Sequence, residues 1–463
     1  MKKDIIQILK SWREKDSKLN STESLLAWIK ELNDTNVVNI TRSIMKPAEY
    51  WFYNPDKGII ENRNKRFFSI RGLQYKRKGE VLAEQPIIYQ MEIGFLGIIC
   101  KEFDGVMHFL MQAKVEPGNV NCVQISPTIQ ATKSNFEQAH GGNVPNYFSY
   151  FQNSKEHTII FDQVQSEQGT RFYKKRNRNI MIRVDEDIEV LPAFRWMTLG
   201  QIKELMKIDN LVNMDTRTVL SCIPLSTYHY DEKELKEIEE CFGKKELFAS
   251  IFQTNIQDDI VSVYNHLNDV KMFLDTKAKL VPLTALKDWN VDETGVHCRK
   301  EACFDVEYFD IEISGREVRN WKQPLLCARG IGTFGLFVCR HEGVTKFLVS
   351  IKTEIGAFDS VEIGPTIFME AVNMEKSDYI TEMFFDQMNK GEGVINDGLF
   401  SEEGGRFYHE QNRNVILMTD YIPPEKLPKG YFWMSYSSLN GLVQINNCLN
   451  IQLRNLLSII DIV

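Results

Sequence analysis

The chain has 463 residues, of which 43% are hydrophobic and 25% are charged. These values are ordinary for globular proteins, and the length corresponds to two to four domains that can each bury a sizeable core. The formal net charge of −8 argues against a general nucleic-acid-binding protein.

The nine cysteines are scattered along the chain, and no CxxC pair or zinc-ligand set is present. Reduced thiols in a cytoplasmic protein are the simplest interpretation. Charged residues follow the first methionine closely, so we expect no signal peptide, and no apolar run reaches the length of a membrane helix. We therefore expect a cytoplasmic protein without a membrane partner.

The first 40 residues have the apolar spacing of helices. Ile5, Leu9 and Trp12 share one helical face, and Ser21 precedes a second apolar series as a helix cap does. We expect residues 1–40 to form helices that pack on the protein or serve as a dimer arm.

Residues 41–225 alternate short apolar runs with turns, which predicts a strand-rich domain. A hairpin is predicted with its turn at Asp104 and Gly105. The proline–threonine pair at 127–128 can start a helix. Residues 196–211 have helical spacing and predict a helix at the end of this domain.

After a connector of helical spacing at 226–279, residues 280–463 repeat the features of the first domain in the same order. The repeat continues through the closing helices without a gap, so the sequence predicts two tandem copies of an α+β domain, 41–225 and 280–463. The corresponding segments are 109–116 and 347–354, 124–129 and 362–367, 166–173 and 401–408, and 177–179 and 412–414.

The two copies differ most in a polar series that alternates with apolar residues. In the first copy this series includes Gln112, Gln124 and Gln130. A solvated sheet face is one explanation; the other is a pocket for a neutral, hydroxyl-rich ligand, because glutamine both donates and accepts hydrogen bonds. We infer that the first copy keeps the fuller polar site. The second copy has Ser350, Glu362 and Phe368 at these positions, whereas Lys114 and Glu116 recur as Lys352 and Glu354.

A basic cluster follows at 171–178. Its outer members, Arg171 and Arg178, recur in the second copy, but the cations between them do not. The forked guanidinium group of arginine suits a diphosphate. An internal ion pair, for example between Arg171 and Glu167, is the alternative.

His140 lies in a glycine-rich loop and has no counterpart in the second copy. A lone histidine is more often structural, but a loop beside a polar sheet face is also a suitable place for a general acid or base.

Motifs for common cofactors are missing from the sequence. It contains no GxGxxG after a strand, no P-loop and no GxSxG elbow, and residues 401–405 preserve only a fragment of a Nudix box. Chemistry without a cofactor, or no chemistry, remains.

Four long motifs, at 112–118, 127–135, 165–172 and 209–217, resemble those of the NDP-hexose 2,3-dehydratase family. The resemblance covers roughly residues 25–460. It implies two tandem Nudix-like domains that lack the Nudix metal box, and a homodimer. It also implies a nucleotide-linked 4-keto-6-deoxyhexose as substrate, with dTDP as the expected nucleotide, on a route to 2,6-dideoxysugars.

The second copy departs from the family pattern, because Phe368 and Phe400 stand where the family repeats glutamines. We therefore expect the first copy to be active and the second to be auxiliary.

The reaction that the resemblance implies needs a base for the C3 hydrogen, an acid for the C2 hydroxyl and donors near the C4 oxygen. The catalytic candidates are Glu116 and His140, with Glu167 and Tyr147 behind them. We expect no cofactor; a non-catalytic nucleotide-sugar-binding protein and a Nudix-type pyrophosphatase are the alternatives. The candidates for binding the sugar and the diphosphate are Gln112, Lys114, Gln124, Gln130, Arg171, Arg178 and Arg217.

Overall fold

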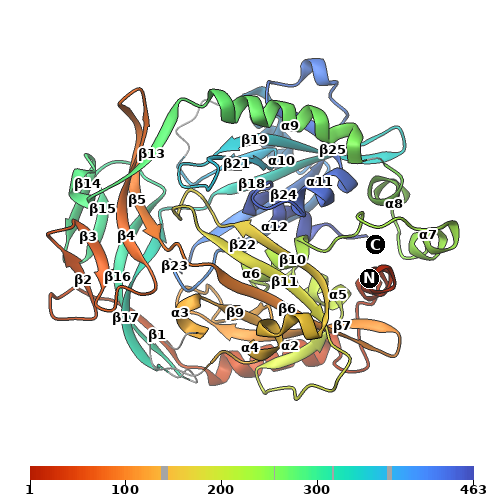
Figure 1. Cartoon of the computed structure of the whole chain (residues 1–463), viewed down its shortest axis with the longest axis horizontal. Coiled ribbons are helices and arrows are strands. Elements are labelled where there is room, and N and C mark those ends of the chain that lie inside the picture. The colour runs from red at the N-terminus through yellow and green to blue at the C-terminus, as the bar shows by residue number, and fades with distance from the viewer. Residues whose placement is uncertain (137–143, 255, 315–317, 373–377, 463) are drawn as a thin grey trace.

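The computed structural model describes residues 1–463 except 137–143, 255, 315–317, 373–377 and 463. It is a mixed α+β structure in which each half of the chain contributes one large sheet. Two smaller sheets lie together at one end of the molecule, on the left of Figure 1.

The large sheet of the first half has seven strands within the described residues and the order β10-β11-β6-β7-β12, with β8 beside β7 and β9 beside β6. Only the β11–β6 pair is parallel. Its strands are β6 (Gly94–Phe103), β7 (Val106–Val115), β8 (Val123–Ser126), β9 (Ile129–Ala131), β10 (Thr158–Ser166), β11 (Arg176–Arg183) and β12 (Phe194–Met197).

The large sheet of the second half has the order β22-β24-β18-β19-β20, with β21 beside β18 and β25 beside β19. Strand by strand this is the order of the first sheet, including the single parallel pair, β18–β24. Its strands are β18 (Thr333–His341), β19 (Val344–Thr353), β20 (Val361–Gly364), β21 (Ile367–Met369), β22 (Val394–Ser401), β24 (Gln411–Met418) and β25 (Tyr431–Ser435).

The two smaller sheets exchange strands between the halves. Strand β1 (Val38–Arg42), from the start of the chain, pairs with β16 (Phe304–Ile313) of the second half. Strand β13 (Thr276–Val281) pairs with β4 (Ser69–Arg77) of the first half. The other strands of these sheets are β2 (Trp51–Asn54), β3 (Ile59–Asn62), β5 (Glu80–Tyr89), β14 (Trp289–Asp292), β15 (Gly295–Cys298), β17 (Asn320–Ala328) and β23 (Phe407–Tyr408).

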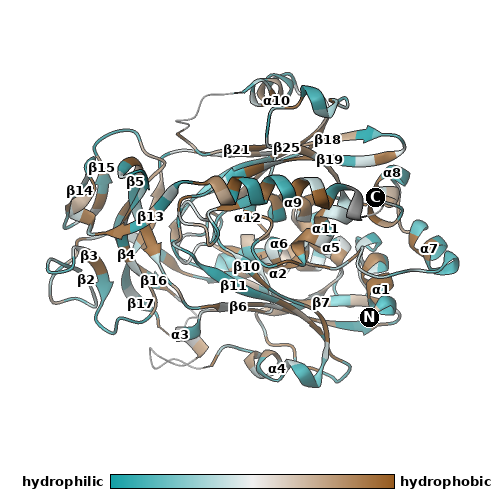
Figure 2. Ribbon diagram, turned by 45° about the horizontal axis from the view of Figure 1, so that its top comes forward, coloured by the Kyte–Doolittle hydropathy of each residue, from teal (hydrophilic) through white to brown (hydrophobic). Residues whose placement is uncertain are grey.

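Helices fill the space between the two large sheets and cover their outer faces (Figure 2). A continuous apolar core joins both sheets to the central helices, with Phe109 and Leu220 from the first half and Phe347 and Leu453 from the second. The central helices are α5 (Leu199–Leu205), α6 (Met214–Ser221), α11 (Tyr436–Val443) and α12 (Ile451–Ile459). The others are α1 (Lys2–Arg13), α2 (Thr22–Thr35), α3 (Lys133–Phe136), α4 (Phe148–Gln152), α7 (Glu232–Glu239), α8 (Lys245–Phe252), α9 (Ile256–Phe273) and α10 (Tyr379–Lys390).

The helices before each half occupy matching places. Helix α1 packs on β7, and α8 packs on β19, which has the place of β7 in the second sheet. The helices predicted for residues 1–40 are therefore present and pack on the protein, but they end at Thr35, and strand β1 begins at Val38. The helices predicted for 226–279 are present as well, but that segment ends in a strand, β13.

Two local predictions were wrong. The proline–threonine pair at 127–128 stands directly before strand β9 and not before a helix. The Thr128 hydroxyl explains this, because it accepts from the Ile99 amide at 2.9 Å and donates to the Leu110 carbonyl, which fixes it between β6 and β7. The helix predicted for 196–211 is confined to Leu199–Leu205, since β12 runs to Met197 and Thr198 forms a capping box with Gln201. The predicted hairpin turn at 104–105 is confirmed.

The fold depends on close backbone contact between the halves at Gly118. A Cβ atom built there would lie 1.5 Å from the Phe407 carbonyl oxygen. Because backbone cannot yield as a side chain can, we expect Gly118→Ala to lower the free energy of unfolding by about 3 kcal/mol or more. Thermal or urea unfolding measures this.

Gly105→Ala is the matched control. Gly105 has a positive φ but open space around its Cβ position, so only the left-handed backbone penalty of about 1–2 kcal/mol is expected. A Gly118→Ala protein as stable as Gly105→Ala would contradict the close contact.

Candidate active site

Two loops cross from one half of the molecule to the other. We call residues 166–171 the first crossing loop and residues 401–406 the second crossing loop. The Gly169 amide of the first loop donates to the Glu354 carboxylate at 2.8 Å, and its carbonyl accepts from Gly356 at 2.8 Å. Ser166 donates to the Glu362 carboxylate at 2.7 Å. The first crossing loop therefore lies on the second half.

The second crossing loop makes the reciprocal contacts with the first half. Its Gly404 carbonyl accepts from the Gly118 amide at 2.7 Å. The Gln124 amide donates to the Ser401 hydroxyl at 2.5 Å. Each half thus receives the loop of the other, and the polar cluster of each half contains residues from both.

A buried arginine donates hydrogen bonds to the backbone of each crossing loop. Arg217 of α6 donates to the Ser401 carbonyl at 3.0 Å and stacks over Phe400. Arg454 of α12 donates to the Ser166 carbonyl. Burial lowers the pKa of Arg217 to about 10. Arg217, which we expected to bind a diphosphate, is thus placed to hold the second crossing loop.

We call the buried polar side chains around Glu116 in the first half the first cluster. In it, the Lys114 ammonium lies 3.1 Å from a carboxylate oxygen of Glu116. The Gln130 amide donates to both oxygens of that carboxylate at 3.3 Å and accepts from Asn213, the cap of α6, at 3.0 Å. The structure therefore brings together three of the predicted residues, Lys114, Glu116 and Gln130.

The second crossing loop adds charged groups to the first cluster. Glu403 pairs with Arg406 at 2.9 Å, and Arg406 donates to the Gln90 side chain at 2.9 Å. A Cβ built on Gly405 would lie 3.5 Å from a carboxylate oxygen of Glu116, which places the loop directly over Glu116. Burial raises the pKa of Glu403 to about 7.

Asp215, in the first turn of α6, is 2% exposed and belongs to the same cluster. Burial raises its pKa well above the ordinary value, and the nearby charges of Glu167, Glu403 and Glu116 raise it further. The first cluster therefore holds a carboxyl group whose protonated form is favoured, as a general acid requires.

Glu167, a predicted catalytic candidate, is buried beside the first cluster. Its carboxylate accepts from the Asn177 amide on β11. Lys175 lies near it and donates to the Glu92 carbonyl. Burial and, secondly, the charge of Arg406 lower the pKa of Lys175 to about 8.

The second half has a matching second cluster. Its Glu354 accepts from Asn450, the cap of α12, at 3.0 Å. Burial raises the pKa of Glu354 to about 7. Burial and then the charge of Glu354 raise the pKa of Glu362 to about 8.

Arg171 belongs to the second cluster and not to the first. Its guanidinium lies 3.0 Å from Glu370 and 3.4 Å from Glu410, and stacks on Phe304. Neither predicted role, a first-copy diphosphate ligand or an ion pair with Glu167, matches these contacts. The first crossing loop carries Arg171 away from Glu116 to the other half.

Other predicted residues lie apart from the first cluster. Arg178 forms a two-pronged pair with Asp162 on the neighbouring strand, at 2.7 and 2.5 Å, and Arg413 repeats this pair with Asp397. The recurrence of Arg178 is therefore explained by sheet structure.

The remaining candidates make ordinary structural contacts. The Tyr147 hydroxyl donates to the Glu189 carbonyl at 2.8 Å, and its ring packs on Phe194 in the outer core of the first sheet. Gln112 is half-buried on β7, opposite Phe194 of β12. His140 lies outside the described residues.

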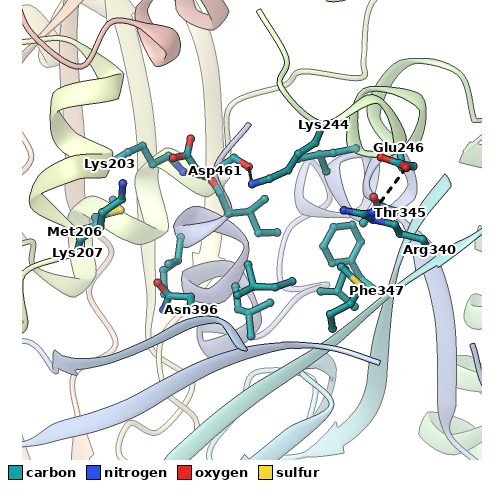
Figure 3. A pocket seen from close by; sticks show the side chains of 17 residues that line it. Lys203, Met206, Lys207, Lys244, Glu246, Arg340, Thr345, Phe347, Asn396 and Asp461 are labelled. Carbon is teal, nitrogen blue, oxygen red and sulfur yellow. Dashed lines mark hydrogen bonds and ion pairs between the residues drawn. The ribbon is translucent and has the colours of Figure 1, made fainter. Parts of the chain in front are cut away.

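A cavity of about 310 Å³ lies away from both clusters, where α5, α8 and the end of the chain meet β18 and β19 (Figure 3). None of the predicted site residues lines it. Its cations have partners: Lys203 donates to the Ile460 carbonyl at 2.9 Å, and Lys244 to the Asp461 carbonyl at 3.1 Å. We assign no chemistry to this cavity.

Across the residues that the structure describes, no group of three or more His, Cys, Asp or Glu side chains is arranged to hold a metal ion. In the same part of the chain no helix is both long and apolar enough to cross a membrane.

These features define a two-half α+β protein with buried acid–base clusters at the crossing of its halves. The chain belongs to the NDP-hexose 2,3-dehydratase family, whose model matches residues 22–223 and 261–460. The resemblance seen in the sequence is thereby confirmed.

Three relatives are named dTDP-4-dehydro-6-deoxy-α-D-glucopyranose 2,3-dehydratase. The protein from Saccharopolyspora spinosa is 36% identical over 446 residues, covering 94% of this chain and 90% of the relative. That from Streptomyces violaceoruber is 34% identical, covering 95% and 97%. That from Amycolatopsis orientalis is 32% identical, covering 95% and 90%.

Sequence reasoning missed Asp215, Glu403 and Arg406 as members of the first cluster. The crossing of the loops leaves no periodic signal, so Glu403 and Arg406 were attributed to the second copy. One signal was readable: Asp215 and Glu403 are matched in the repeat by glutamines, Gln452 and Gln168.

The pKa of Glu362 predicts a pH-dependent stability. The folded protein keeps a proton on Glu362 up to a pH of about 8, whereas the unfolded chain releases it near pH 4.3. The folded state therefore binds more protons between these values, and stability falls as pH rises through this window.

Glu362→Gln, which installs the residue that the first half has at this place, removes this titration. The melting temperature of the variant relative to wild type should rise steadily from pH 5 to pH 8 and then level off. The same change at the exposed Glu80 is the control. A difference in melting temperature between wild type and Glu362→Gln that stays constant from pH 5 to pH 8 would contradict the assignment.

Proposed function

We propose that this protein catalyses the 2,3-dehydration of dTDP-4-keto-6-deoxyglucose, and that the reaction takes place at the first cluster. Family membership and the names of three relatives support the reaction. The observation that carries the location is the placement of the carboxyl groups of Glu403 and Asp215 near Glu116, where the second cluster has the glutamines Gln168 and Gln452.

The chemistry fits groups of this kind. The hydrogen on C3 is α to the C4 carbonyl, so a base can remove it and leave an enolate. The enolate expels the C2 hydroxyl, which is β to the carbonyl, when an acid protonates the leaving oxygen. The enol product then tautomerises to a 3,4-diketo-2,6-dideoxy sugar. An acid and a base that titrate near the working pH are the most effective.

The neutral and cationic members of the first cluster have complementary tasks. Gln130 can hold a sugar hydroxyl by donating and accepting at once. Lys114 can stabilise the negative charge that develops on the C4 oxygen, because a cation aimed at that position favours the enolate over the ketone.

We also propose that the two halves are tandem copies of one Nudix-like domain. The identical strand orders of the two large sheets, the matched parallel pairs and the reciprocal exchange of β1 and β13 support this. The homodimer and the cytoplasmic location remain proposals, the second supported by nine cysteines that are all free thiols.

The comparison of Glu116→Gln with Glu354→Gln tests the location directly. Both side chains are buried at the same place in their halves. Glu116→Gln should lower kcat by about 10²-fold or more, because it removes the ion-pair partner of Lys114 and a charge that raises the pKa of Asp215, and Glu354→Gln should lower kcat far less. Turnover of dTDP-4-keto-6-deoxyglucose, coupled to a 3-ketoreductase, is the assay. If Glu354→Gln abolished turnover and Glu116→Gln did not, the reaction would belong to the second cluster.

The reaction should need no divalent metal. Activity is therefore expected to be unchanged after incubation with EDTA and gel filtration into metal-free buffer. Loss of turnover that Mg²⁺ or Mn²⁺ restores would favour a Nudix-type pyrophosphatase instead, and release of dTMP from the substrate would identify that activity.

A further inference from the structure

The two clusters can be compared residue by residue, because two features fix their equivalence. The first is the start of the paired helices α6 and α12. Asn213 caps α6 and Asn450 caps α12, each accepting from the amide three residues later. Asp215 and Gln452 therefore take the same position, two residues after the cap.

The second feature is the start of each crossing loop. Glu167 accepts from Asn177, and Glu402 accepts from Asn412 at 2.7 Å, so both loops leave their sheets in the same way. The next residue in each loop reaches the other half. It is Gln168 in the first crossing loop and Glu403 in the second.

At both equivalent positions the first cluster has a carboxyl group and the second has an amide. All four polar side-chain atoms of Gln168 and Gln452 are buried without a hydrogen-bond partner, as is one carboxylate oxygen of Asp215. Buried polar atoms normally have partners, so these positions suit a polar ligand. Only the first cluster can exchange a proton with a ligand there, because an amide does not titrate in this pH range.

Resting on the function proposed above, we propose that Asp215 and Glu403, one from each half, are the general acid and general base of the elimination. The second cluster, with Gln452 and Gln168 in their places, is a polar site that cannot carry out the reaction. Glu403 thus comes from the half that we expected to be auxiliary.

The charges around the two groups assign their roles. Glu403 pairs with Arg406 at 2.9 Å, which favours its ionised form and suits a base. Asp215 is buried beside Glu167, Glu403 and Glu116, with Lys114 as the countercharge, which favours its protonated form and suits an acid. Neighbouring carboxyl groups that share one proton are a known way to hold an acid and a base together.

The step balances without a further reactant. The carboxylate of Glu403 takes the proton from C3, and the electrons of the C–H bond form the enolate with the C4 oxygen. When the C4 carbonyl reforms, a double bond joins C2 and C3, and the C2 oxygen leaves with the proton of Asp215 as water. Transfer of a proton from Glu403 back to Asp215 resets the pair.

Glu403→Gln and Asp215→Asn, which remove the charge and keep the shape, test the pair. Each should lower kcat by about 10²–10⁴-fold, with dTDP binding within a few-fold of wild type. In D₂O, proton NMR of the substrate should show exchange at C3 with Asp215→Asn, where the base is intact, and none with Glu403→Gln. Gln452→Met and Gln168→Met, at the equivalent places, are the matched controls and should lower kcat far less.

The proposal fails if either first-cluster variant keeps more than about a tenth of the wild-type kcat, or if the controls lose as much as the variants. An inactive wild type would instead overturn the proposed function. If Glu403→Gln does not fold, the pH dependence of the wild-type kcat tests the base instead. The wild-type kcat should fall as pH drops below about 7, where Glu403 becomes protonated. A rate constant that stays level from pH 5.5 to pH 8 would contradict the assignment of the base.

Discussion

The candidate site depends on two places where the halves cross and a glycine of one half forms a backbone hydrogen bond with a glycine of the other. Gly118 bonds to Gly404 in one direction, and Gly356 bonds to Gly169 in the other, at 2.7 and 2.8 Å. A Cβ at any of these positions would lie under 3 Å from backbone or a neighbouring side chain. These contacts are hydrogen bonds between backbone amides and carbonyls. Moving the halves apart would break them, and any of these groups that stayed buried would lose its partner. The crossings in turn bury the carboxylates above them, and this burial raises their pKa values towards neutrality.

The repeat in the sequence predicted the α+β class and the correspondence between the halves, because equivalent glycines, prolines and apolar residues recur in one order. It could not predict the exchange of β1 and β13, since the pattern of a strand specifies its buried face but not its partner. At the site, Lys114, Glu116 and Gln130 could be identified because they combine polarity with strand alternation. Arg171 was assigned to the polar site of the first half although its partners Glu370 and Glu410 lie in the second, because a crossing has no local signature.

Recurrence of a residue in both halves of the chain marks structural residues as readily as functional ones. Arg178 recurs because its pair with Asp162 ties two neighbouring strands, and Arg217 recurs because each crossing loop needs a buried donor. The informative positions are those where one cluster has a carboxyl group and the other has an amide. Burying several carboxylates together lowers stability, and such strain is typical of sites that perform chemistry. At the second cluster, glutamines take the places of Asp215 and Glu403, so two of these buried carboxyl groups are absent there.

A crystal structure with an unreactive substrate analogue, dTDP-6-deoxyglucose bearing a hydroxyl at C4, tests the shared site most directly. The account predicts the sugar in the first cluster, with C2 and C3 within about 3.5 Å of the carboxyl groups of Asp215 and Glu403, one from each half. A sugar bound only beside Arg171 in the second cluster, or in the cavity next to Lys203, would contradict it.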